Sequence, residues 1–114
     1  MTDAFGRELK IGDYVVKLSG SDYYDNRYIF RVFGFDEEKS FVYIVEWDNQ
    51  SYRSKNVFEN FDYACEHVVE YYKAKCGMYG PAKRIINDKI VKTYPPVWQK
   101  YDDMEKPKKK KENN

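Results

Sequence analysis

One stretch in the middle of this chain holds two strongly β-prone runs separated by a short charged turn, and it constrains the fold more than any other feature. The runs are Tyr28–Phe35 and Phe41–Trp47, and the turn between them is Asp36–Ser40. A second polar turn, Asp48–Gln50, leads into a third short run, Ser51–Phe58. Residue type and turn chemistry together predict an antiparallel β-meander.

Both faces of this meander are apolar. Alternation of side chains assigns Phe30, Val32, Val42 and Ile44 to one face, and Ile29, Phe33, Phe35, Phe41, Tyr43, Val45 and Trp47, beside Arg31, to the other. A sheet with one solvated face should alternate apolar and polar residues instead. The second face must therefore be covered, since so large an apolar patch is rarely exposed on a soluble monomer.

A helix that follows the meander in sequence is suited to cover this face. Apolar residues recur at i, i+3 and i+4 spacing between residues 61 and 76, at Phe61, Ala64, Cys65, Val68, Val69, Tyr72 and Cys76. Gly77 is well placed to end the helix. We therefore expect a single helix over residues 62–76, lying on the outer face of the meander.

The flanking segments give weaker signals. Before the meander, Tyr14–Leu18 reads as a strand. After the helix, residues 80–100 begin with a short helix that has Pro81 at its first turn, and the same residues also allow a hairpin that turns at Asn87-Asp88. We favour the helix. Pro95-Pro96 then requires extended chain, which anchors on the body through the residues that follow it.

The chain reads as one domain, residues 1–101, with a disordered Lys-rich tail at 102–114. The charge is uneven: residues 1–60 contain 8 basic and 11 acidic side chains, whereas residues 61–114 contain 12 basic and 8 acidic ones. The folded body is therefore mildly acidic, and the basic character lies in the tail.

No signal peptide or membrane span is evident, so we expect a cytoplasmic protein without membrane contact. Cys65 and Cys76 would lie about 16 Å apart along one helix, too far for a disulfide, and should be free thiols. The abundance of Lys, Tyr, Asn and Ile is typical of an AT-rich genome, such as that of a phage or a low-GC bacterium.

Residues 11–61 resemble the small five-stranded barrels of Src-homology-3 type, in particular the Tudor and KOW branch. The matching segments are Ile11–Val15, Tyr28–Val32 and Tyr43–Trp47, followed by a polar turn. The resemblance implies an α+β fold, in which a small antiparallel five-stranded barrel packs against a C-terminal helix and a disordered basic tail follows.

Tudor-like barrels often hold a cationic or methylated side chain in an aromatic cage at one rim. Carried over by position, the implied partner-binding residues are Tyr23, Tyr24, Tyr28 and Trp47, with Asp48 and Asn49 as polar partners. The turn after Trp47 lacks the second aromatic residue that the family often has there. The alternative is that Trp47 and Tyr28 are core residues, and we weight this alternative more heavily.

The residues that catalysis or metal binding needs are sparse. His67 is the only histidine, and Cys65, two positions before it, would point to nearly the opposite side of a helix. Two cysteines without further ligands make no zinc site, and the six glycines form no phosphate-binding loop. We expect no catalytic residues, no metal and no cofactor, and hence no enzyme.

The favoured function is a non-catalytic binding module, such as a small regulator or adaptor that docks on a protein partner through the barrel rim or through a strand edge such as Ser51–Lys55. The alternative is a KOW-like nucleic-acid-binding protein that contacts the backbone through surface cations and the tail. Its candidate residues are Arg27, Arg31, Arg53, Lys55, Lys108, Lys109, Lys110 and Lys111. A structural subunit of a larger assembly ranks third.

Overall fold

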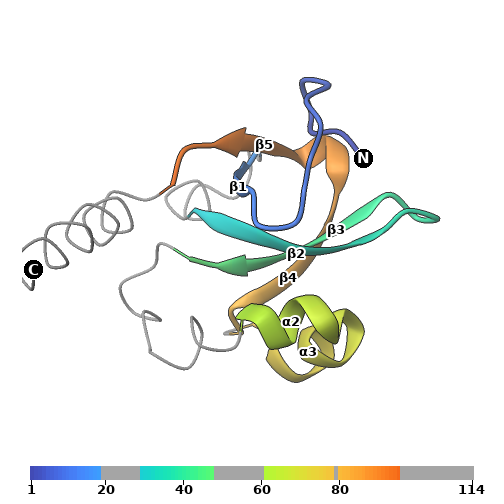
Figure 1. Cartoon of the computed structure of the whole chain (residues 1–114), viewed down its shortest axis with the longest axis vertical. Coiled ribbons are helices and arrows are strands. Elements are labelled where there is room, and N and C mark those ends of the chain that lie inside the picture. Colours follow the sequence, from blue (N-terminus) through green and yellow to red (C-terminus); the bar gives the residue numbers. More distant parts are fainter. Residues whose placement is uncertain (19–28, 48–60, 79, 96–114) are drawn as a thin grey trace, which may run out of the picture.

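The computed structural model describes residues 1–18, 29–47, 61–78 and 80–95 (Figure 1). These residues form a small α+β fold with five strands, two α-helices and one 3-10 helix. In chain order the elements are β1 (Tyr14–Lys17), β2 (Phe30–Asp36), β3 (Phe41–Glu46), α2 (Phe61–Glu66), α3 (Val68–Lys75), β4 (Ala82–Ile86), η3 (Asn87–Lys89) and β5 (Ile90–Thr93).

The strands form one antiparallel sheet in the order β4-β3-β2-β1-β5. β4 and β5, which are neighbours in sequence, therefore lie at opposite edges of the sheet. A flat sheet would separate these edges by about 19 Å, at about 4.8 Å per strand. The connection from Ile86 to Ile90 through η3 reaches at most about 14 Å. The sheet must therefore curl until its two edges approach each other at η3.

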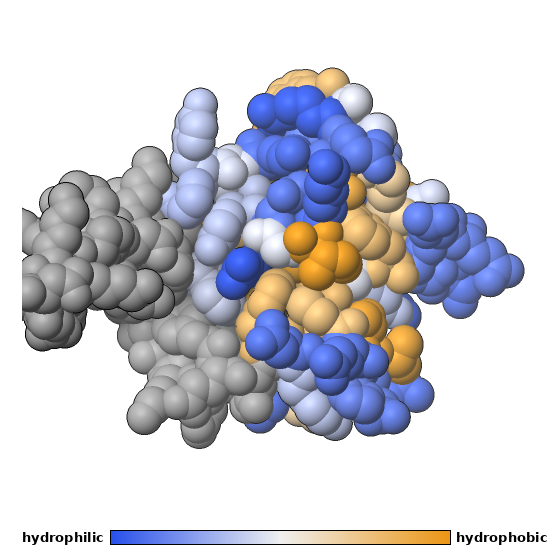
Figure 2. Space-filling view, in the orientation of Figure 1, coloured by the Kyte–Doolittle hydropathy of each residue, from blue (hydrophilic) through white to orange (hydrophobic). Residues whose placement is uncertain are grey.

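The predicted hairpin between β2 and β3 is present, with Asp36 paired to Phe41 and a turn between them. The carboxylate of Asp36 accepts a hydrogen bond from the backbone N–H of Lys39 at 3.2 Å, which stabilises the turn. The turn projects from the sheet in Figure 1, and Figure 2 shows that its surface is hydrophilic. A charged, solvated turn is what the sequence Asp36–Ser40 predicts.

A β-bulge in β2 changes which side chains face the helices. Val32 pairs with Ile44, and Gly34 pairs with the adjacent residue Tyr43, so Phe33 is the extra residue. After the bulge the alternation is reversed, and Phe35 packs with the inner cluster. The expectation that Phe35 shares a face with Phe33 is therefore wrong, because simple alternation does not include a bulge.

The inner, concave face of the sheet holds one hydrophobic cluster. Its buried members are Leu9, Val15, Phe30, Val32, Val42, Ile44 and Ile90. The outer face holds a second cluster that the two helices complete, consisting of Phe33, Tyr43, Val45, Trp47, Ala64, Tyr71 and Ala82. Apart from the residues after the bulge, the two faces divide their apolar residues as the sequence predicts.

The segment that lies on the outer face is two helices and not the expected single helix. α2 ends at Glu66, and His67 between the helices has a non-helical backbone (φ −130°, ψ 58°). The break comes directly before Val68, which packs on Gly34: a Cβ built on Gly34 would lie 2.5 Å from Val68 Cγ1. Only glycine allows this close approach of helix and strand. The second helix ends before Gly77, as predicted.

The segment after the helices differs most from expectation. Residues 82–86 and 90–93 are strands, so the favoured short helix is wrong. The alternative hairpin is also wrong, because β4 pairs with β3 and β5 pairs with β1, and not with each other. The sheet consequently extends to Thr93, and not only over the expected residues 11–61. The third run of the meander and the Lys-rich tail lie outside the described residues.

Candidate functional site

Arg31 on β2 lies among three aromatic rings of its own chain. Its guanidinium carbon is 4.2 Å from the ring centroid of Phe61, 4.8 Å from that of Trp47 and 5.1 Å from that of Tyr14. Its Nε also donates a hydrogen bond to the carbonyl oxygen of Gly12 at 3.1 Å. The three rings therefore already bind a cation, and this cation is the Arg31 side chain of the same protein.

Trp47 is consequently a core residue. Its side chain is only 4% exposed and belongs to the outer-face cluster. The ring of Trp47 is therefore not an exposed rim residue, and the core alternative holds for Trp47. The other residues of the predicted cage, Tyr23, Tyr24, Tyr28, Asp48 and Asn49, lie outside the described residues.

The same contacts bear on the predicted nucleic-acid surface. Arg31 uses its guanidinium for the three rings and for the carbonyl of Gly12, so it is not a free surface cation. The remaining residues of that surface, Arg27, Arg53, Lys55, Lys108, Lys109, Lys110 and Lys111, lie outside the described residues. No described residue therefore supports that surface.

A second arginine stacks on aromatic rings at the edge of the sheet. The guanidinium of Arg84 on β4 is 4.8 Å from the ring of Phe41 and 5.2 Å from that of Tyr72. A hydrogen bond with the side chain of Tyr43 raises the pKa of Arg84 further above its ordinary value. These contacts hold an exposed, permanently charged side chain along the β4 edge.

The outward edge of β4 presents backbone groups that have no partner among the described residues. The carbonyl of Pro81 and the N–H of Asn87 both bond to residues on the β3 side. Hydrogen-bonding direction alternates along an antiparallel strand, so the N–H and C=O groups of Arg84 and Ile86 point away from β3. Neither residue has a backbone hydrogen bond on that side among the residues that the structure describes. Both residues are exposed, Ile86 to 40%.

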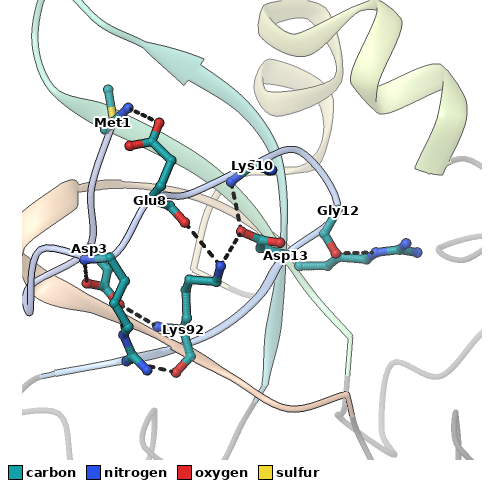
Figure 3. Close-up of polar contacts among 9 residues, drawn as sticks. Met1, Asp3, Glu8, Lys10, Gly12, Asp13 and Lys92 are labelled. Carbon is teal, nitrogen blue, oxygen red and sulfur yellow. Dashed lines mark hydrogen bonds and ion pairs between the residues drawn. The ribbon is translucent and has the colours of Figure 1, made fainter.

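The outward edge of β5, in contrast, is covered by the N-terminal segment (Figure 3). The backbone N–H of Ala4 donates to the carbonyl of Ile90 at 2.9 Å. At Lys92, the N–H donates to the carboxylate of Asp3 at 3.0 Å, and the carbonyl accepts from the guanidinium of Arg7 at 3.2 Å. Three outward backbone groups of β5 are thus hydrogen-bonded.

Asp3 is the centre of this cover. Its side chain is fully buried and accepts hydrogen bonds from the backbone N–H groups of Phe5, Arg7 and Lys92 and from Nε of Arg7, all at 2.9–3.0 Å. Burial alone would raise the pKa of Asp3, but these hydrogen bonds and the charge of Arg7 outweigh it, so its pKa is lowered. Asp3 is therefore charged in the folded protein at neutral pH.

A hollow of about 250 Å³ runs along the open β4 edge. Its lining comes from four consecutive β4 residues, from the end of α3 and from β1: Ala82, Lys83, Arg84, Ile85, Tyr72, Cys76, Gly77 and Lys17. Successive strand residues point to opposite faces, so a hollow that touches four in a row must follow the edge of the strand. Three of its lining side chains are cationic and none is acidic.

Cys65 lies in α2, and His67 lies between α2 and α3. Burial, assisted by the charge of Asp62, raises the pKa of Cys65, so its thiol stays protonated at neutral pH and is a weak nucleophile. His67 stacks on Tyr63 at 4.4 Å between ring centroids, and its Nδ1 lies 3.8 Å from the carboxylate of Glu70. Both described cysteines are free thiols, as expected.

Within the described parts of the chain, no three His, Cys, Asp or Glu side chains converge as a metal site would require. The described helices include none with the length and apolar character needed to cross a membrane. Comparisons with protein-family models, with curated proteins and with solved structures gave no match. Function must therefore be argued from the geometry of this chain itself.

The sequence interpretation missed the residues of both edges. Lys83, Arg84 and Ile86 were assigned to a helix, although the alternation of the hairpin alternative would have placed them on a strand. Asp3 carried a usable signal, because an Asp favours a compact turn when it accepts from the N–H two residues later and has an Arg four residues later. The turn covers β5 through a contact between Asp3 and Lys92, which are almost ninety positions apart in the sequence.

Proposed function

We propose that this chain is a non-catalytic protein-binding module that accepts an extended segment of a partner at the β4 edge. The observation that carries this proposal is the open edge itself, where exposed N–H and C=O groups of Arg84 and Ile86 have no backbone partner among the described residues. An incoming strand would satisfy these groups, as in the β-augmentation that many peptide-binding domains use. Each new hydrogen bond would contribute roughly 0.5–1.5 kcal/mol net.

The proposal includes a fold of the Src-homology-3 type. Its support is the strand order β4-β3-β2-β1-β5, the curl that the short η3 connection imposes, and the antiparallel pairing throughout. In this proposal the five strands form a small Tudor-like or KOW-like barrel in which the seam between the two edge strands, β4 and β5, is open. The helices between β3 and β4 then act as an insertion that covers one face.

Binding through a backbone edge does not need the aromatic rim. Trp47 and Arg31 stabilise the outer face from within, and the candidate site moves from the rim to the β4 edge. The nucleic-acid alternative is less well supported, since Arg31 is engaged internally. A regulatory or adaptor role is compatible with a module of this kind.

The proposal can be tested by selecting extended peptides that bind the full-length protein from a random display library and mapping them by NMR. Peptides that occupy the proposed site should shift the backbone amides of Arg84 and Ile86 most. Ile86→Pro removes the outward N–H, and its backbone already has φ −66° and ψ 143°, which proline adopts without strain. We expect Ile86→Pro to abolish binding while Ile86→Ala, which keeps the N–H, retains most of it.

Two results would overturn the proposal. One is that no selected peptide perturbs the β4 amides. The other is that Ile86→Pro and Ile86→Ala bind equally well, because the outward N–H would then contribute nothing.

A further inference from the structure

We infer that the segment accepted at the β4 edge is an acidic one, with carboxylates on neighbouring residues that meet Lys83 and Arg84 on the two sides of the strand. This inference rests on the proposed function and adds the chemistry of the partner. It starts from the hollow along the edge, whose lining contains Lys17, Lys83 and Arg84 and no acidic side chain.

The two β4 cations lie on opposite faces of the sheet. Lys83 pairs with Ile44, an inner-face residue, and Arg84 pairs with Tyr43, an outer-face residue. The side chain of Lys83 makes no hydrogen bond or ion pair with any described residue, and its charge is available to a ligand. Arg84 is held in place by its stacking on Phe41 and Tyr72 and is already ordered before a ligand arrives.

An added strand would follow the same alternation as β4. Its successive side chains point alternately to the inner and the outer side of the edge. One carboxylate would therefore face Lys83, and a carboxylate on the next residue would face Arg84. Two adjacent Asp or Glu residues in an extended segment match this arrangement, whereas a helix would place them about 100° apart around one axis.

Backbone chemistry favours a peptide over a nucleic acid. The open edge offers carbonyl acceptors as well as N–H donors at Arg84 and Ile86. A peptide backbone supplies both complementary groups, whereas phosphates are acceptors only and would leave the carbonyl groups of β4 unsatisfied. The hollow, at about 250 Å³, is also smaller than the roughly 300–1,000 Å³ of typical small-molecule pockets.

The exposed side chain of Ile86 adds a short apolar contact at one end of the edge. Towards the other end the edge is closed, because Ala82 is only 1% exposed and belongs to the outer-face cluster. The site therefore suits a short segment, with its acidic pair centred on Lys83 and Arg84 and an apolar or β-branched residue near Ile86.

The test uses fluorescence anisotropy of three labelled peptides of the same length on the full-length protein. The peptides share a β-branched frame of Thr and Val and carry at their two central positions Glu-Glu, Gln-Gln or Lys-Lys. We expect the Glu-Glu peptide to bind about tenfold more tightly than the Gln-Gln peptide at low salt, and this advantage to shrink as salt rises. The Lys-Lys peptide should bind most weakly.

Charge reversal at the site gives the matched control. Lys83→Glu should remove the preference for the Glu-Glu peptide and improve binding of the Lys-Lys peptide. Lys10→Glu makes the same change in net charge on an exposed residue that does not line the hollow, and it should leave the preference nearly unchanged. Circular dichroism and the urea midpoint of each variant confirm that folding is intact.

The outcomes separate this inference from the proposed function. If all three peptides bind equally and Ile86→Pro abolishes their binding, the edge is a strand acceptor without charge preference, and the acidic partner is wrong. If none of the three peptides binds while library-selected peptides still shift the β4 amides, the acidic partner is wrong; if no peptide of either kind binds, the proposed function is wrong as well. If a single-stranded oligonucleotide displaces the Glu-Glu peptide from the β4 amides and binds more tightly, the peptide assignment is overturned in favour of nucleic acid.

Discussion

The two edges of the sheet differ in whether their outward backbone groups are hydrogen-bonded. At β5 the N-terminal segment satisfies the backbone groups of Ile90 and Lys92, with Asp3 at the centre of the contacts. At β4 the corresponding groups of Arg84 and Ile86 have no backbone partner in the described residues. An open edge is a risk for aggregation, and proteins usually cover or charge it. One edge here is covered, and the other is charged.

The charges on β4 would oppose pairing of the open edge with the same edge of a second copy. Two copies of this protein that approached edge to edge would bring Lys83 and Arg84 close to the same residues of the other copy, and like charges would repel. An acidic segment would instead be attracted by Lys83 and Arg84. In the proposed function, the same two cations would oppose self-association and favour an acidic partner, which is how specificity commonly arises.

The largest effect on this comparison should come from removing the β5 cover. Asp3→Asn replaces a carboxylate that accepts four hydrogen bonds with an amide whose NH2 group must face one pair of donors. We expect the free energy of unfolding to fall by about 3 kcal/mol. Urea denaturation measures it. Glu8→Gln is the control, because the Glu8 side chain is 63% exposed and should contribute under about 0.5 kcal/mol. Equal effects of both substitutions would mean that Asp3 is not the centre of the cover.

The next effect should come from the close contact between β2 and α3. Gly34→Ala places a methyl group against Val68, and we expect a loss of about 2 kcal/mol because strand and helix must separate. Adding Val68→Ala removes the two methyl groups that clash, and the double variant should be less destabilised than the sum of the two single variants. The urea midpoints of the four proteins give this coupling. Simple additivity would show that the contact is not tight.

A smaller, pH-dependent effect should weaken the β5 cover at acidic pH. The pKa of Asp3 is lower in the folded than in the unfolded protein. Its contribution to stability is therefore fully present above the unfolded value of about 3.9 and is lost as the pH falls through the folded value. Unfolding measured from neutral to acidic pH should show that Asp3→Asn flattens this part of the profile. An unchanged slope in Asp3→Asn would contradict the assigned role.

The smallest effect on stability should come from Ile86→Pro at the open edge. Proline there removes an N–H that bonds to no described residue and fits the observed backbone. We expect the urea midpoint to match that of Ile86→Ala, with a difference under about 0.5 kcal/mol. A much less stable proline variant would show that the Ile86 N–H has a partner within the chain, and the edge would not be open.

The parts of the fold that depend on local sequence were predictable. The hairpin over Asp36–Ser40, the two-sided character of β3 and the helical character of residues 61–75 follow from residue type, turn chemistry and periodicity. The bulge at Phe33 and the break at His67 were not predicted. Both lie at the contact of Gly34 with Val68, where packing between distant segments overrides the local pattern.

The candidate site was not predictable from local pattern alone. The edge position of β4 follows from pairing with β3, about forty residues earlier, and the cover of β5 follows from the opposite end of the chain. Arg31 was noticed as a polar residue on an apolar face, but its role among the rings of Tyr14, Trp47 and Phe61 depends on three separate elements. Spacing in sequence carries no information about such contacts between separate elements.

Amide hydrogen exchange of the free protein, followed residue by residue by NMR, tests the contrast between the two edges most directly. The N–H groups of Arg84 and Ile86 should exchange rapidly, while those of Lys83 and Ile85, which face β3, and that of Lys92, which donates to Asp3, should be protected. Protection of Arg84 and Ile86 equal to that of Lys92 would contradict the account, because both edges would then be closed.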